Sequence, residues 1–293
     1  MIGFNASLLQ PLKKRAGRFF APLRRGQSAA ISLVVLSAMV YQGIALAEMA
    51  VHFIDVGQGG GVFIQKDGKN ILYDCGDTFA GPTVTEYLDA LDVDTLDLLI
   101  ISHAHKDHMG GCTHVLQKVK VKRVYHNGSK ARTGTWRKFL KVAGQKSRAI
   151  PVEKDMTEDD IEILVAYDSH GQYSKEADNS VLVRLIDGKV RVLLTGDCEA
   201  ICEKEVSTTS NVQSEVLNVG HHGSNAASSL EFLKKVKPKI AVIQAGAGNQ
   251  YGHPKPSVLT RLKQVGATIY RTDKDGSIVI HSDGNTVKAE TEK

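Results

Sequence analysis

Four side chains that can bind a metal ion fall within six residues, directly after the apolar run 96–102. Such a run is typical of a buried central strand. His103 and His105 alternate along the chain, so in an extended loop they point to the same side and can chelate one ion. Asp107 and His108 open the following turn and can face a second ion. Imidazole and carboxylate together suit zinc, and also manganese or iron. The alternative, a solvated polar loop, explains poorly why four such ligands follow one buried strand.

Two other expected strands also end in residues that can bind metal. Asp197 follows the run 190–195, where a carboxylate beside a glycine can bridge two ions, although alone it would more often cap a helix. His221 and His222 follow the run 216–219. A histidine pair in isolation means little, but here three separate strands end in such residues.

The rest of the chain alternates short strands with amphipathic helices, and strand runs occur at both ends. This order predicts an α+β fold in which two sheets pack face to face and helices cover them. Glycine-rich turns between the first three strands indicate an antiparallel meander, and Asp187-Gly188 indicates a hairpin. The expected strands are 51–56, 61–65, 70–74, 96–102, 121–126, 180–186, 190–195, 216–219, 240–244, 268–271, 277–281 and 286–289, and the expected helices are 110–119, 135–143, 229–236 and 255–264.

Residues 1–47 have the layout of a secretory signal. A basic stretch ends at Arg25, the apolar run 29–41 follows, and Ala45-Leu46-Ala47 offers small residues at the positions that a signal peptidase reads. The apolar run is short for a bilayer span, which needs about 20 residues. An uncleaved N-terminal anchor is the alternative. In either case we expect one exported domain over residues 48–293, in the periplasm or outside the cell.

The net charge of +5 does not indicate nucleic-acid binding by that domain. Residues 1–47 contain six basic residues and no acidic residue, so residues 48–293 carry 31 basic and 32 acidic side chains. The domain therefore lacks a global bias toward phosphate backbones.

The four cysteines allow disulfides in an exported protein, with three possible connectivities. Cys198 and Cys202 lie four residues apart on an expected helix, a poor geometry for a bridge. Buried free thiols are the alternative.

The motifs resemble the metallo-β-lactamase superfamily, whose H-x-H-x-D-H signature HAHKDHMGG matches in full. Asp74 in LYDCG matches the acidic residue that orients the ligand loop. A closer resemblance is to the hydrolase domain of ComEC-type competence DNA-uptake proteins, in a stand-alone, exported form. It rests on HFIDVGQG (52–59), NSVLVRL (179–185), LLTGDCEA (193–200), VLNVGHHGS (216–224), NQYGHPKPSVLTRL (249–262) and GATIYRTDKDG (266–276).

Two features depart from the ComEC-type pattern, and a third departs from the superfamily but looks shared with the ComEC-like branch. ComEC-type domains usually read G-Q-G-D where this chain has Gly60. They are fused to a membrane channel, whereas a stand-alone form without that channel is expected here. The isolated histidine of the superfamily's third motif is also missing, and Asp178 and Asn179 occupy the matching region. One ion is therefore expected to have fewer protein ligands and to be held more weakly or to be open to a substrate oxygen.

The resemblance implies a four-layer αββα sandwich and two divalent metal ions, zinc or else manganese. It implies that one ion, called the first ion below, is held by His103, His105 and Asp197. The second ion is held by Asp107, His108, Asp197 and one of His221 and His222, of which His222 is favoured. A metal-bound hydroxide shared by the ions is the expected nucleophile.

The catalytic residues expected beside the ions are Asp107, His221 and His253. His221 would support a ligand or contact substrate. His253, in a Gly-His-Pro turn, would protonate a leaving group or bind a phosphoryl oxygen; the alternative is a turn residue fixed by Pro254.

The resemblance favours an exported metal-dependent phosphodiesterase or nuclease acting on a phosphate ester or nucleic acid. The same site serves many substrates, so a hydrolase of another ester, amide or thioester is an alternative. A non-catalytic module for DNA uptake or envelope assembly is a third. A membrane contact is expected only through an uncleaved N-terminal segment, and the sequence indicates no protein partner.

Overall fold

The computed structural model describes residues 49–166, 173 and 175–293. The expected signal segment 1–47 lies outside these residues. Among the helices that the structure describes, none has both the length and the hydropathy needed to cross a bilayer.

The first sheet has the strand order β15-β14-β1-β2-β3-β4-β5-β6. Its β1, β2 and β3 form the predicted antiparallel meander, and β3 to β6 are parallel to one another. The strands are β1 (Met49–Phe53), β2 (Val62–Lys66), β3 (Lys69–Tyr73), β4 (Thr95–Ile101), β5 (Lys120–His126), β6 (Arg148–Pro151), β14 (Ile278–Ser282) and β15 (Val287–Thr291).

The second sheet has the order β13-β12-β11-β10-β9-β8-β7. The hairpin predicted at Asp187-Gly188 joins β9 to β10, and β10 to β13 run parallel. The strands are β7 (Met156–Glu158), β8 (Ile161–Val165), β9 (Val181–Asp187), β10 (Val190–Leu194), β11 (Val216–Asn218), β12 (Ile240–Ile243) and β13 (Thr268–Arg271).

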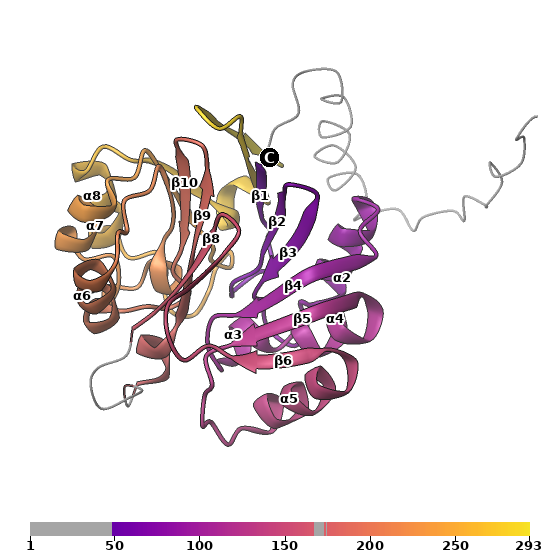
Figure 1. Ribbon diagram of the computed structural model, residues 1–293. Helices are drawn as coiled ribbons and strands as arrows, with labels where there is room; N and C mark the ends of the chain where they lie inside the picture. The colour runs from indigo at the N-terminus through magenta and orange to yellow at the C-terminus, as the bar shows by residue number, and fades with distance from the viewer. Residues whose placement is uncertain (1–48, 167–172, 174) are drawn as a thin grey trace, which may run out of the picture.

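The two sheets pack face to face between two layers of helices, which confirms the predicted αββα sandwich (Figure 1). Alternating side chains decide which core each strand residue joins. On β2, Ile64 lies between the sheets, whereas Phe63 packs under the helices of the first sheet. On β10, Val192 lies between the sheets and Leu193 packs under the helices of the second sheet. The outer helices are α2 (Gly81–Ala90), α4 (Cys112–Lys118) and α5 (Gly134–Lys146) on the first sheet, and α6 (Ala200–Thr209), α7 (Leu230–Val236) and α8 (Pro256–Gln264) on the second.

Some elements were not predicted from the sequence. Helix α2 begins with Gly81 and Pro82 and contains β-branched residues, which weaken a helical pattern. It forms because Val84 and Leu88 are fully buried against the first sheet. Strands β6, β7 and β8 were also missed, and β7 is only three residues long.

Both pairs of cysteines form disulfides, Cys75–Cys112 and Cys198–Cys202. The interpretation that the second pair has poor geometry is therefore wrong. Helix α6 begins at Ala200, so Cys198 lies in the turn before it, and the two Cα atoms are 5.4 Å apart. That distance is the usual one for a bridge.

Because neighbouring strands are parallel, the loops that carry the candidate metal ligands leave each sheet at the same edge. In the first sheet β3 and β4 are in register, so the segments after Tyr73 and Ile101 start side by side. In the second sheet β10, β11 and β12 end together in the same way. The two edges are joined by the Gln244 side chain, which donates to the backbone oxygens of Ile54 at 3.1 Å and Gly61 at 2.8 Å.

Candidate metal centre

The loop after β4 is held by a buried carboxylate from the end of β3. Asp74 accepts hydrogen bonds from the Ser102 backbone nitrogen at 2.8 Å and the Ser102 hydroxyl at 2.6 Å. Its Oδ2 also lies 2.8 Å from Nδ1 of His108. Asp74 therefore fixes both the start of the loop and the orientation of one imidazole. His108 lies on the short helix α3 (Lys106–Met109).

Asp197 lies at the centre of the site and is almost completely buried. It follows Gly196, which adopts a left-handed φ of 53°. A Cβ on Gly196 would lie 2.7 Å from the Ser102 Cβ and 3.0 Å from the Tyr73 hydroxyl, both on the first sheet's side. Glycine therefore lets the second sheet bring its carboxylate up to the histidines of the first.

Four imidazoles surround Asp197, two at each oxygen. His108 and His222 approach Oδ1 with Nε2 distances of 3.0 and 3.6 Å. His103 and His221 approach Oδ2 with Nε2 distances of 3.6 and 3.5 Å.

The remaining predicted ligands adjoin this arrangement. His105 Nδ1 lies 2.8 Å from His103 Nε2. Asp107 Oδ2 lies 3.4 Å from His222 Nε2. In each of two sets of residues, the ligand atoms all lie within 4.8 Å of one another. One set is His103, His108 and Asp197, and the other is Asp107, His108 and His222.

A left-handed turn presents the two adjacent histidines that follow β11. The segment η3 (Gly220–Gly223) has φ of 49° at His221 and 55° at His222. Left-handed backbone is unfavourable for residues with a side chain, and such strain is common at functional sites. His222 Nδ1 is 2.9 Å from the Gln244 carbonyl oxygen, and His221 Nδ1 is 2.9 Å from Glu199 Oε1.

Charges and burial compete over protonation in the site. Burial lowers the pKa of His103 well below its ordinary value, and the positive charge of His108 adds to the effect. For His108 burial acts in the same direction, but Asp197 and Asp74 outweigh it and raise the pKa well above its ordinary value. Burial acts to raise the pKa of Asp197 and of Asp107, but neighbouring imidazoles outweigh it and lower both. Both carboxylates are therefore ionised at neutral pH.

The donor set fits divalent metal ions. Asp197 Oδ1 is buried and has no hydrogen-bond partner among the described residues, although imidazole nitrogens surround it. Two ligand atoms about 2.1 Å from one tetrahedral ion lie about 3.4 Å apart. The separations between the Nε2 atoms and Asp197 run from 3.0 to 3.6 Å. Imidazoles and carboxylates in this arrangement suit zinc or manganese.

A cavity of 290 Å³ opens onto the ligands. His253 lies in its wall, and burial, followed by the charges of His222 and His221, lowers its pKa to about 4. The exposed ring of Tyr251 stacks on His253, with centroids 5.7 Å apart and planes inclined by 25°. The residues lining the cavity are Gln58, His105, Lys106, Asp107, Asp197, His221, His222, Tyr251 and His253.

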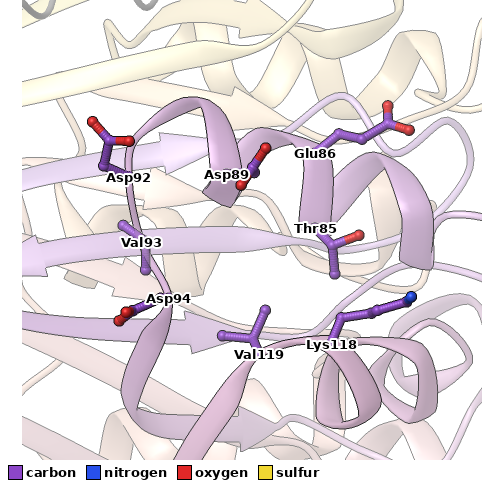
Figure 2. A pocket seen from close by; sticks show the side chains of 8 residues that line it. All are labelled: Thr85, Glu86, Asp89, Asp92, Val93, Asp94, Lys118 and Val119. Atoms are coloured by element: carbon purple, nitrogen blue, oxygen red, sulfur yellow. The ribbon is translucent and has the colours of Figure 1, made fainter. Parts of the chain in front are cut away.

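A larger hollow of 530 Å³ lies between α2 and α4 but does not belong to the site (Figure 2). It includes Val93 and Asp94, which precede β4, whereas the histidines follow that strand. The strand's seven residues separate the two places by about 20 Å. Figure 2 shows the side chains of Glu86, Asp92 and Asp94 pointing in different directions rather than converging.

The structure brings together every residue that the sequence singled out for the site. His103, His105, Asp107, His108, Asp197, His221 and His222 surround one carboxylate or adjoin it, and His253 faces them across the cavity. Sequence reasoning missed Glu199 and Gln58 as parts of the site. Glu199 lies two residues after Asp197, and Gln58 follows a glycine turn after β1; neither position by itself indicates a contact with His221 or the cavity.

Known proteins are similar to this chain in sequence and in fold. The chain is 30% identical over 254 residues to the ComE operon protein 3 of Bacillus subtilis (strain 168), covering 79% of this chain and 33% of that protein. It is 30% identical over 259 residues to recombination protein 2 of Haemophilus influenzae, covering 87% and 31%. The chain thus spans about a third of the length of these relatives.

A solved structure, the metallo hydrolase Igni18 of the archaeon Ignicoccus hospitalis, has a TM-score of 0.51 at 15% identity, covering 78% of this chain and 98% of that chain. The sequence profile of the Metallo-beta-lactamase superfamily matches residues 54–246, more than half of the chain. The chain belongs to the metallo-β-lactamase superfamily.

Proposed function

We propose that this protein is an exported, metal-dependent phosphodiesterase or nuclease that acts on a phosphodiester. The observation that carries the proposal is the division of four imidazoles between the two oxygens of Asp197. A carboxylate with ligands gathered at each oxygen is suited to bridge two ions. Two-metal sites of this kind serve hydrolysis of phosphate esters.

The residues that would hold the ions come from both sheets. His103, His105 and Asp197 would hold the first ion, and Asp107, His108, Asp197 and His222 the second. When bound, such ions make a water molecule nucleophilic at neutral pH and neutralise negative charge on substrate oxygens.

The chain's own residues position substrate around this centre. Lys106 and His253 lie in the cavity wall. The Lys106 ammonium pairs with Asp77 at 3.1 Å and would exchange that partner for a phosphate. The His253 imidazole can donate a hydrogen bond to a phosphoryl oxygen or a leaving group. The exposed ring of Tyr251 beside them offers a surface on which a base can stack. These features favour a phosphodiester over an amide or thioester, and the name of one relative, recombination protein 2, points to nucleic acid.

The disulfides support export. Cys75–Cys112 and Cys198–Cys202 account for all four cysteines, and structural disulfides persist in oxidising compartments. The signal-like segment 1–47 leads to the same proposal, with the mature chain starting at Glu48.

The activity is tested with bis(p-nitrophenyl) phosphate and a single-stranded oligonucleotide. We expect hydrolysis of both, abolished by a chelator and restored by zinc or manganese. Cleavage of carboxyl esters or thioesters without cleavage of either phosphodiester would identify the alternative hydrolase. Tight binding of two ions with no turnover of any substrate would favour the non-catalytic module.

Export is tested by intact-mass measurement on the native protein. We expect a mass that begins at or near Glu48, in the periplasmic or secreted fraction. A full-length soluble cytoplasmic species contradicts the proposal.

A further inference from the structure

We propose that His221 is a ligand of the first ion and fills the place of the missing third-motif histidine. The sequence favoured a supporting or substrate-binding role for His221 and left it as the alternative to His222 at the second ion. The inference rests on the two-metal centre proposed above. It adds a fourth protein ligand to the ion that sequence reasoning expected to be poorly held.

The first argument is the symmetry of the site about Asp197. His108 and His222, the histidines at Oδ1, would hold the second ion, and one comes from each sheet. His103 and His221 are arranged in the same way at Oδ2, at 3.6 and 3.5 Å. The His221 nitrogen is thus as close to Oδ2 as the nitrogen of His103, a predicted ligand of the first ion.

The second argument is which ring nitrogen each histidine presents. His108 Nδ1 contacts Asp74, and His103 Nδ1 lies 3.0 Å from the Ser102 hydroxyl. His222 Nδ1 contacts the Gln244 carbonyl oxygen, and His221 Nδ1 contacts Glu199. All four therefore direct Nε2 toward Asp197.

An Nδ1–H group that donates to a carboxylate or carbonyl leaves Nε2 with its lone pair, and this is the usual state of a histidine bound to a metal. Glu199 is well suited to this role, because its carboxylate is 7% exposed and also pairs with Lys175. His253, in contrast, is in the same cavity, but its Nδ1 has no hydrogen-bond partner among the described residues. The pattern thus separates His221 from the histidine assigned to substrate.

The third argument is that the residues in the third-motif region face elsewhere. The Asn179 side chain bonds to the backbone of Tyr173 and Lys175. The Asp178 side chain is buried, and its Oδ1 has no hydrogen-bond partner among the described residues. Neither residue is among the side chains gathered at the Asp197 oxygens, so a further protein ligand of the first ion would come from another segment.

The test measures metal binding rather than turnover. Purified full-length protein is stripped of metal and titrated with cobalt, whose visible absorption reports the ligands of each site, and metal content is measured after gel filtration. The variants are His221→Ala and Glu199→Gln, and the matched control is His114→Ala, which removes a half-buried histidine on α4 away from the cavity.

Wild type and His114→Ala are expected to bind two ions. His221→Ala is expected to keep one ion at its wild-type affinity and to bind the other at least about 100-fold more weakly. Glu199→Gln, a positioning variant, is expected to weaken the same site about 10-fold to 100-fold. Should His221→Ala fail to fold, Glu199→Gln still tests the proposal, because it keeps a hydrogen-bond acceptor in place.

Two ions bound at wild-type affinity by both variants would overturn the inference. If His221→Ala then loses turnover, His221 transfers protons or contacts substrate instead. Absence of phosphodiesterase activity in the wild type, with one ion lost from the variant, would overturn the proposed function and leave this inference standing.

Discussion

The two halves of the sandwich contribute to one site in different ways. The first sheet supplies four of the candidate ligands from one loop, between His103 and His108. The second sheet supplies its candidates from two loops, with Asp197 after β10 and the histidine pair after β11. The first group is contiguous in sequence, whereas the second exists as a group only because β10 and β11 are parallel neighbours. The contiguous motif identifies the site, but Asp197, which comes from a separate loop, divides the histidines into two pairs, one at each of its oxygens.

Each half of the sandwich has a disulfide close to its candidate metal ligands. Cys75 follows Asp74 and pairs with Cys112, just beyond α3. Cys198 follows Asp197 and pairs with Cys202 on α6. Each half thus has a disulfide next to the carboxylate that organises its histidines. The loops differ in length, with sequence separations of 37 and 4.

The largest expected effect comes from removing the charge of a candidate carboxylate ligand, and Asp197 of the second half is compared with Asp107 of the first. Asp197→Asn removes charge from both ion sites, so both ions should be lost and hydrolysis should fall at least about 1,000-fold. Asp107→Asn affects only the second ion, so it should fold, melt near the temperature of metal-free wild type and lose at least about 100-fold. Steady-state kinetics and metal analysis check both variants. Full activity of Asp107→Asn on a phosphodiester contradicts the two-metal proposal.

The disulfides should differ in their contribution to stability. By the loop-entropy relation, closing the loop between Cys75 and Cys112 contributes about 4 kcal/mol, and closing that between Cys198 and Cys202 about 2 kcal/mol. Double alanine variants of each pair, unfolded in urea without metal, measure the two values. An equal loss in the free energy of unfolding from both variants would show that loop entropy does not set the contributions of the two disulfides.

One buried group in each half should make the free energy of unfolding depend on pH, and the two dependences should have opposite signs. Burial lowers the pKa of His52 in the first half to about 3, so its contribution to the free energy of unfolding is lost as pH falls below about 6.5. Burial raises the pKa of Glu203 in the second half to about 7, so that contribution is lost as pH rises from about 4.5 to 7. Each term changes by about 2 kcal/mol between pH 5 and pH 8.

Single variants separate the two terms. Relative to wild type, His52→Leu should lose stability as pH rises from 5 to 8, and Glu203→Gln should gain it. Urea unfolding of the metal-free proteins at both pH values measures the slopes. Parallel profiles in all three proteins would show that neither group titrates as described.

The smallest expected effect concerns the exposed aromatic residues of the two halves. Tyr251 lines the cavity, whereas Phe79, 85% exposed, does not. Tyr251→Ala should raise KM for a single-stranded oligonucleotide about tenfold, as loss of one stacked base predicts. The Lys106 ammonium lies over the Phe79 ring, so Phe79 is not a neutral control. Ile201→Ala, which truncates a 57% exposed side chain on α6 outside the cavity, is the control and should change KM little. An unchanged KM in Tyr251→Ala would remove stacking from the substrate model.

Much of the fold could be predicted because local patterns and tertiary packing agree. The strand expected at 268–271 is the observed β13, and the apolar run 96–102 became β4 with a shift of one residue. Helix α2 could not be predicted, since its glycine and proline weaken the local signal and burial of Val84 and Leu88 stabilises it. The Cys198–Cys202 bridge was misjudged because the start of α6 was unknown.

The sequence by itself determined the superfamily, the order of layers and the identity of the candidate ligands, because these depend on residue type, spacing and periodicity. Only the tertiary structure decided how the ligands divide. The pairing of His221 with Glu199, and of both histidine pairs with the two oxygens of Asp197, depends on a left-handed turn and on a glycine that lets the sheets approach. Such contacts join residues from different strands, and their geometry is set by how the sheets pack rather than by any local pattern.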